Sequence, residues 1–193
     1  MDMTAAYYEG EKITFIDYKK NNFEQAEYDN CRFENCDFSN NKLNNSIFAD
    51  CTFIDCNFSL AELSGTTFQQ VLFKNCKLLG LQFQQCNRFG LSFTFENCNI
   101  DHASFYQLKL KKTTFRSCQL REVDFSEADL TGSSFQNCDL NQAIFDQTNL
   151  EQVDFRDAQN LMLSPNKNKL KKAKFSLLSL PGLLSEYDIK IES

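Results

Sequence analysis

The chain has 193 residues, with 20 lysines and arginines against 26 aspartates and glutamates, and a formal net charge of −6 at pH 7. This length predicts one domain, and the acidic balance argues against direct, sequence-specific binding of nucleic acid. The first residues lack the apolar run of a signal peptide, and no segment has the apolar length needed to span a membrane. We therefore expect a cytoplasmic protein without membrane contact.

A repeat of five residues governs most of the sequence. Every fifth residue from Phe23 to Phe83 is Phe, Tyr or Leu, and every fifth residue from Phe95 to Phe155 is Phe, Ile or Leu. A helix would need spacings of three and four, and a half-buried strand would alternate, so neither element fits the pattern. A short internal repeat instead predicts a solenoid, in which each copy buries its apolar residues against its neighbours.

A second ordered position lies two residues before each central residue and holds a small or thin side chain, such as Cys31 or Ser46. Residues two apart on an extended backbone point the same way, so each unit turns one bulky and one small side chain inward. Like residues recur every twenty positions, as Cys98 and Cys118 do, and from Ile100 onward Leu or Ile alternates with Phe. Twenty residues are four units, which predicts four sides per turn.

All nine cysteines occupy the small inward position, if Cys86 is counted with the first frame. An odd number of cysteines without an export signal argues against a disulfide framework. Zinc ligands usually lie two to four residues apart, whereas Cys31 and Cys36 are five apart, and the only histidine is His102. We predict reduced core cysteines, no metal site and no cofactor.

The segment from Ala128 to Phe145, ADLTGSSFQNCDLNQAIF, repeats Ala or Cys, a polar residue, Phe or Leu, and two polar residues. This pattern resembles the pentapeptide repeat family over roughly residues 16–158. The resemblance implies an all-β fold, a right-handed quadrilateral β-helix. It indicates much less about function, because one scaffold carries many roles.

The repeat is interrupted once. Phe83 and Phe95 are twelve residues apart, where ten would keep the phase, and Arg88 falls at what should be a buried central position. Either the first frame continues through residues 91–93 before it slips, or a small loop bulges out at residues 88–94. The loop is either a tolerated insertion at a corner or a protruding contact surface. The candidate contact loop consists of Arg88, Phe89 and Gly90.

Two regions follow from this organisation: residues 1–160 as the β-helix, with the slip at about 84–94, and residues 161–193 as a closing rung, short helix and tail. In the second region, Ala173 and Phe175 return to the second frame and predict a last rung. Ser179 could cap a helix that has Pro181 in its first turn.

The open end of a β-helix must be covered. The carboxy-terminal segment is either an intramolecular cap or the interface of a two-fold homodimer, and we favour the dimer. One helix face and a following alternating, strand-like segment supply the apolar residues. The candidate interface residues are Leu180, Leu183, Leu184, Tyr187, Ile189 and Ile191.

Charge is distributed unevenly along the chain. Residues 1–160 hold 23 acidic and 14 basic side chains, whereas residues 161–193 hold 3 acidic and 6 basic ones. A run of nine acids in outward positions contains only one basic residue, Arg156. Placed on the square, these acids distribute over all four sides, so they serve either solubility or attraction to a basic partner. This candidate acidic surface consists of Glu122, Asp124, Glu127, Asp129, Asp139, Asp146, Glu151, Asp154 and Asp157.

The repeat, the mid-chain irregularity and the carboxy-terminal tail are similar to those of the Qnr-type quinolone-resistance members of the family. That resemblance implies a dimeric acidic DNA mimic that binds DNA gyrase and topoisomerase IV and counters fluoroquinolones. A rod of about seven turns at ~4.8 Å each would be about 34 Å long. The chain departs from strongly protective members, which carry projecting loops, because its phase leaves room only for the two-residue slip.

No catalytic arrangement is recognisable: there is one histidine, no phosphate-binding glycine loop and no nucleophile–base pairing. We therefore expect no enzyme activity and no small-molecule substrate. The alternative to topoisomerase binding is a structural or regulatory scaffold that docks an unidentified protein on its flat sides.

Overall fold

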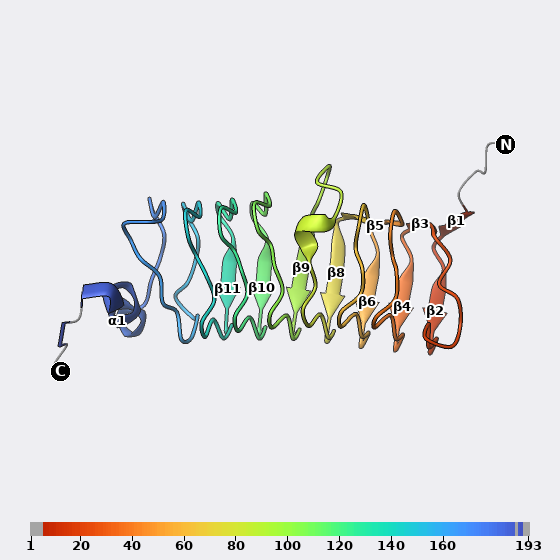
Figure 1. The fold of residues 1–193 in the computed structure, drawn as a ribbon, viewed down its shortest axis with the longest axis horizontal. Coiled ribbons are helices and arrows are strands. Elements are labelled where there is room, and N and C mark those ends of the chain that lie inside the picture. The colour runs from red at the N-terminus through yellow and green to blue at the C-terminus, as the bar shows by residue number, and fades with distance from the viewer. Residues whose placement is uncertain (1–5, 188, 191–193) are drawn as a thin grey trace.

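The computed structural model describes residues 6–187 and 189–190. The chain winds into a rod that has its first strand at one end and α1 at the other (Figure 1). The strands are β1 (Ala6–Glu9), β2 (Lys12–Thr14), β3 (Ala26–Asp29), β4 (Arg32–Glu34), β5 (Ile47–Ala49), β6 (Thr52–Ile54), β7 (Thr67–Gln69), β8 (Val71–Lys74), β9 (Phe93–Glu96), β10 (Thr114–Arg116) and β11 (Ser134–Gln136). The helices are η1 (Phe83–Gln85), η2 (Leu177–Ser179), α1 (Leu180–Leu183) and η3 (Ser185–Tyr187).

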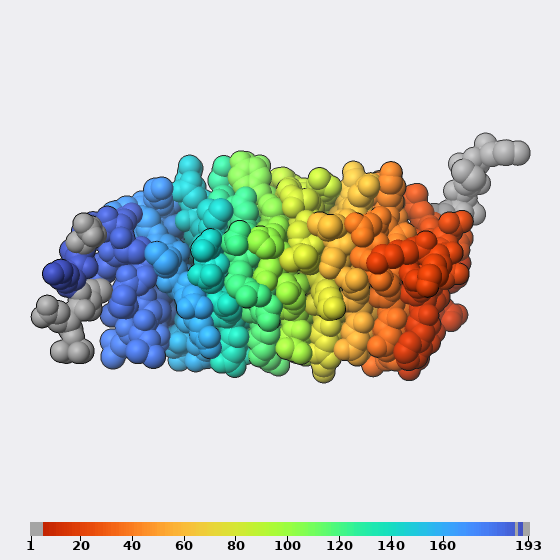
Figure 2. Space-filling model, turned by 60° about the horizontal axis from the view of Figure 1, so that its bottom comes forward, coloured from red at the N-terminus to blue at the C-terminus, as the bar shows by residue number. Residues whose placement is uncertain are grey.

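All strand pairs are parallel and join successive turns of the coil. The order β1-β3-β5-β7 forms side 1 of the rod, and β2-β4-β6-β8-β9-β10-β11 forms side 2. Single bridges hold the other sides, such as Asn57 to Lys77 on side 3 and Ser104 to Asp124 on side 4. Partners lie twenty residues apart, as Phe33 does from Phe53, except across the phase slip, where they lie twenty-two apart. The predicted four-sided turn is confirmed, and successive turns form successive slices of the surface (Figure 2).

The core consists of stacked columns of side chains. Phe115 stacks between Phe95 and Phe135, with ring centroids 5.1 and 4.9 Å apart. From the opposite side of the square, Phe125 meets Phe115 edge to face at 5.9 Å and 82°. The two aromatic columns therefore interlock across the core, as the alternation of Phe with Leu or Ile predicts.

Most units close on a residue in the left-handed region, for example Asn30 with φ 49° and Asn75 with φ 54°. Asn and Asp tolerate this conformation better than other residues with a side chain. The polar composition of the sequence therefore reflects corner geometry as well as a wet surface.

The small inward position often supplies a hydrogen-bond donor. Thr148 Oγ1 donates to the carbonyl of Phe125 at 2.9 Å, and Cys76 Sγ donates to that of Phe53 at 3.4 Å, each in the preceding turn. All nine cysteines are buried and free, which confirms their predicted place in the core. Burial raises the pKa of the Cys51 thiol to about 12, so this thiol is protonated at neutral pH.

This pattern predicts different effects for one substitution at two buried positions. Ser133 Oγ donates to Leu110 O at 2.7 Å and accepts from Thr113 N at 3.1 Å. Ser133→Ala should lower the free energy of unfolding by about 1 kcal/mol, because Leu110 O and Thr113 N each lose one hydrogen bond and keep only the 3.3 Å bond between them. Ser46 is equally buried, but its hydroxyl has no hydrogen-bond partner among the described residues. Ser46→Ala is therefore the matched control and should be neutral or stabilising; equal losses in urea unfolding would contradict the assignment.

The phase slip is absorbed by a loop on side 1, which rises from the coil beside β9 (Figure 1). Cys86 is still buried in the small position of the first frame. The second frame begins with Phe95, which pairs with Phe73 in the preceding turn, twenty-two residues earlier. Phe93 is buried in the small position of the second frame. Its ring centroid lies 5.6 Å from that of Phe68 and 5.3 Å from that of Phe83. Of the two sequence interpretations, the bulged loop is right, but it ends before residues 93 and 94, which belong to β9.

The coil begins earlier than the sequence resemblance indicates. Tyr8, Ile13 and Tyr18 extend the five-residue frame backward from Phe23, and β1 pairs with β3 from Ala6 onward. Residues 6–16 are therefore part of the coil.

At the other end, Phe175 stacks on Phe155 at 5.6 Å, so the predicted closing rung is confirmed. The helix is a single turn: Ser179 is its N-cap residue, but its hydroxyl donates to Ser176 O at 2.9 Å and accepts no hydrogen bond from a helix N–H group. Gly182 is needed here, because a Cβ atom would lie 1.8 Å from Leu161 O. None of the described helices is long and apolar enough to cross a membrane.

Candidate interaction surfaces

The acidic surface lies on all four sides of the rod, as the sequence predicts. Each acid flanks a buried central residue or follows it at a corner, and none is buried. They belong to side 1 (Asp129, Glu151), side 2 (Asp154, Asp157), side 3 (Glu122, Asp139) and side 4 (Asp124, Glu127, Asp146).

Several of these acids hold the corners together. Asp129 Oδ1 accepts from Thr131 N at 3.1 Å, and Lys111 Nζ lies 3.2 Å from its other oxygen. Asp154 accepts from the Arg156 side chain at distances between 2.7 and 3.2 Å. Some acids of this surface therefore stabilise the corners of the coil, while others are exposed without such a role.

The Arg156 guanidinium lowers the pKa of Asp154 through hydrogen bonding. A carboxyl whose pKa is lower in the folded state contributes stability above its unfolded pKa of about 3.9. That contribution is lost as pH falls through the folded value. Asp154→Asn should therefore flatten the acid limb of stability against pH below about pH 4, while Asp157→Asn, on the same rung, should not. Equal acid limbs in thermal melts of the wild type and Asp154→Asn would contradict the assignment.

Five of the nine acids form no ion pair with any described residue: Asp124, Glu127, Asp139, Glu151 and Asp157. Glu127 accepts hydrogen bonds from Tyr106 Oη and Gln107 Nε2, both at 2.8 Å. These bonds lower its pKa, the one from Gln107 most, so Glu127 stays anionic. Asp124 and Asp139 also accept corner amides, from Ser126 N at 2.8 Å and Asn141 N at 3.1 Å, so what sets the five acids apart is the absence of a paired cation among the described residues.

The predicted contact loop projects from side 1, and its residues Arg88, Phe89 and Gly90 are all exposed; Phe89 is 81% exposed. Asn87 shapes the loop by accepting from Phe89 N at 3.1 Å. Gly90 has φ +70° and lies so close to Gln69 that a Cβ atom would be 2.7 Å from its Nε2 atom.

The loop lies beside basic side chains that the sequence analysis did not connect with it. A cavity of about 220 Å³ is lined by Arg88, Leu91 and Lys109 among others. The acid run and this loop therefore present opposite charges, and the loop does not extend the acidic surface. The signal was present in the sequence, because Lys109 lies about one turn after Arg88.

In the carboxy-terminal segment, Leu180, Leu184, Tyr187 and Ile189 are exposed as a docking face requires. Leu183 differs: it is partly buried against the core, so it anchors the segment instead of facing outward. The predicted strand does not begin at residues 189–190, and Ile191 lies outside the described residues.

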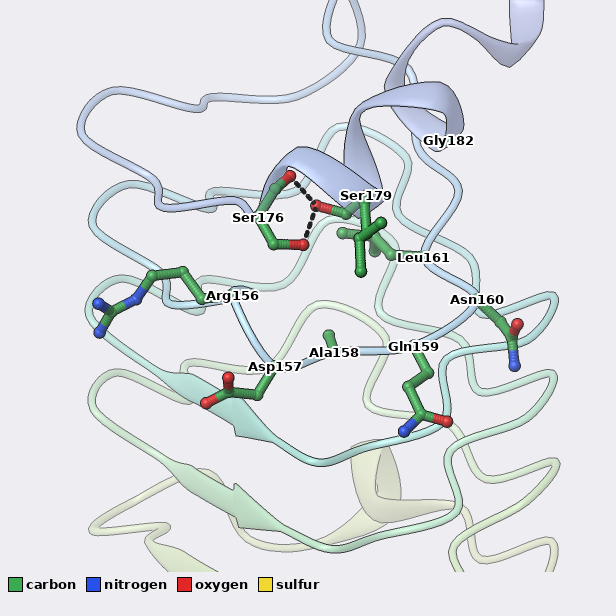
Figure 3. A pocket seen from close by; sticks show the side chains of 10 residues that line it. Arg156, Asp157, Ala158, Gln159, Asn160, Leu161, Ser176, Ser179 and Gly182 are labelled. Atoms are coloured by element: carbon green, nitrogen blue, oxygen red, sulfur yellow. Dashed lines mark hydrogen bonds between the residues drawn. The ribbon is translucent and has the colours of Figure 1, made fainter. Parts of the chain in front are cut away.

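Two further leucines make this end strongly apolar. Leu177 is 85% exposed and Leu178 is 93% exposed, directly after the closing rung. They were missed because the sequence analysis began the helix after them. Beside them a cavity of about 410 Å³ separates Asp157 and Gln159 of the last full turn from Ser179 (Figure 3).

The geometry defines a class of protein: a four-sided parallel β-solenoid built from five-residue units. A family model described as "Pentapeptide repeat region" matches residues 26–105, 73–145, 91–163 and 108–183. The chain belongs to the pentapeptide repeat family.

Solved structures with this fold include QnrB1, a plasmid-mediated fluoroquinolone resistance protein. One trypsin-treated variant of it superposes with a TM-score of 0.70 at 16% identity, covering 100% of this chain and 94% of that one. A second trypsin-treated variant gives 0.50 at 21% identity, with 97% and 98% covered. No curated protein matches in sequence. At these identities the likeness establishes the fold.

Proposed function

We propose that the chain is a non-catalytic, dimeric protein whose acidic surface binds DNA gyrase and topoisomerase IV in place of DNA and thereby counters fluoroquinolones. The observation that carries this proposal is a set of five acids on the rod that form no ion pair within residues 6–187 and 189–190: Asp124, Glu127, Asp139, Glu151 and Asp157. The fold it shares with QnrB1 along its whole length supports the same reading.

The mechanism is electrostatic. A basic DNA-binding groove attracts a negative rod over long range, which raises the rate of association and makes binding sensitive to salt. DNA carries a charge about every 1.7 Å of axis, which is much denser than the charge on this rod. The proposed partner must therefore recognise the shape of the rod in addition to its charge.

The homodimer belongs to the same proposal. Leu177, Leu178 and Leu184 form an exposed apolar end, and a two-fold pairing of two such ends would cover it in both copies. The paired rod would be twice as long, with an acidic half on each side of the joint.

A scaffold with an unidentified protein partner is the second candidate. It is favoured by the use of Asp129 and Asp154 in corner hydrogen bonds and by the spread of acids over all four sides. In that case the acids would serve the fold and solubility.

Neutralisation separates the two candidates. The variant Glu127→Gln, Glu151→Gln, Asp157→Asn removes three charges that bind no basic residue. It should weaken binding of gyrase holoenzyme at low salt by at least about tenfold, and the difference should shrink at high salt. The matched control, Glu9→Gln, Glu27→Gln, Asp50→Asn, removes equal charge near the amino-terminal end. If the wild type binds gyrase and the first variant binds equally well, the scaffold reading is supported instead.

A further inference from the structure

The amino-terminal end of the coil is a cavity walled by tyrosines. It has a volume of about 410 Å³, and Tyr8, Tyr18 and Tyr28 line it together with Ile13, Glu11 and Glu24. The columns below these tyrosines consist of phenylalanine: Phe48 and Phe68 follow Tyr28, and Phe38 follows Tyr18. The change from Phe to Tyr coincides with the end of the coil.

The ring planes lie across the opening. Tyr8 stacks on Tyr28 with centroids 5.2 Å apart and planes at 11°, and Tyr18 stacks on Phe38 at 4.7 Å and 22°. One face of the Tyr8 ring and one face of the Tyr18 ring are therefore covered by the next turn of the coil. The opposite face is turned toward the open end, where both rings border the cavity.

Two carboxylates accompany these ring faces. Glu24 accepts from Tyr8 Oη at 2.5 Å, while its backbone carbonyl accepts from Tyr28 Oη at 2.8 Å. Glu11 lies in the turn between β1 and β2 and lines the same cavity. The bond to Glu24 raises the pKa of Tyr8, so this ring remains a neutral phenol that donates to the carboxyl group.

The lysines near this cavity form ion pairs with acids that do not line it. Lys12 pairs with Glu34 at 3.0 Å, Lys19 with Asp37 at 3.2 Å and Lys20 with Asp17 at 3.2 Å. Among the described residues, no ion pair involves Glu11 or Glu24. The cavity therefore combines electron-rich ring faces and negative charge, and no described lysine or arginine lines it.

We propose that this cavity binds an organic ammonium group. Aromatic faces together with nearby carboxylates attract such cations, and quaternary ammonium groups in particular, without stripping a tight hydration shell. Calcium or magnesium would need six or more oxygen ligands, and among the described residues no group of three or more His, Cys, Asp or Glu side chains could hold a metal ion. The ammonium group could belong to a free small molecule or to a lysine side chain of a protein partner.

The test is calorimetric titration of the full chain with choline chloride, against its uncharged isostere 3,3-dimethylbutan-1-ol and against sodium chloride. Choline should bind at millimolar concentration and the other two should not. An acetylated trimethyllysine amide gives the second arm: tighter binding than choline indicates a protein side chain as the source, and equal or weaker binding indicates a free cation.

Variants locate the site. Tyr18→Leu and Glu24→Gln should each weaken choline binding by about fivefold or more, and Tyr8→Phe, which keeps the ring, should weaken it less than Tyr18→Leu. Tyr7→Leu removes an exposed ring that does not line the cavity and should change nothing. Since Glu24 is exposed, its variant should fold even if Tyr18→Leu does not. Equal binding of choline and the alcohol, no binding of either cation, or full binding by Glu24→Gln would overturn the proposal.

Discussion

Replacing Phe115 by alanine is expected to lower the free energy of unfolding by about 3–5 kcal/mol. Its ring has no exposed surface, stacks on two rings and meets two others edge to face. The substitution leaves a cavity that the neighbouring turns cannot close, because the backbone ladder fixes their spacing. Chemical denaturation followed by circular dichroism measures the loss.

Phe89→Ala is the matched control, since it removes the same side chain from the exposed loop. Its effect should be within about 0.5 kcal/mol. In a solenoid each turn contacts only its neighbours, so hydrogen exchange in the Phe115 variant should rise first in β9, β10 and β11. Similar stability losses in the two variants would contradict the proposed core.

The second large effect concerns association. Leu178→Glu and Leu184→Glu should each convert the proposed dimer into a monomer, because a charge would be buried without a partner at the two-fold joint. Analytical ultracentrifugation reports the change directly. Leu60→Glu is the control: Leu60 is exposed on the coil between β6 and β7, several turns before the carboxy-terminal segment.

A wild-type chain that sediments as a monomer at all concentrations tested would contradict the dimer. The apolar end would then be an intramolecular cap, with Leu183 as its anchor. A monomeric rod could still bind a topoisomerase, so this result would leave the acidic surface to be tested separately.

The period of the sequence was enough to predict the coil, because each five-residue unit places its own side chains. Central residues such as Phe125 and small ones such as Cys118 are buried where the frame puts them. The prediction failed where the frame is weak. The first turn carries a large apolar residue, Phe15, in an outward position, so the family resemblance was drawn only from about residue 16, although the β-helix region was placed at residues 1–160.

The surfaces were harder to predict, because they depend on which turns lie side by side. The period could not show that Asp129 and Asp154 are tied to corner amides, or that Arg88 lines a cavity with Lys109. Leu177 and Leu178 were missed for a similar reason: their exposure depends on how the chain leaves the last rung.

The most direct measurement for the proposed function is a gyrase supercoiling assay in which the purified chain is titrated with and without ciprofloxacin. The proposal predicts restored supercoiling in the presence of the drug, or inhibition without the drug that fades as salt is raised. The neutralised triple variant should lose that effect, and its charge-matched control should keep it. No effect in either condition up to tens of micromolar would contradict topoisomerase binding and leave a pentapeptide repeat scaffold with another partner.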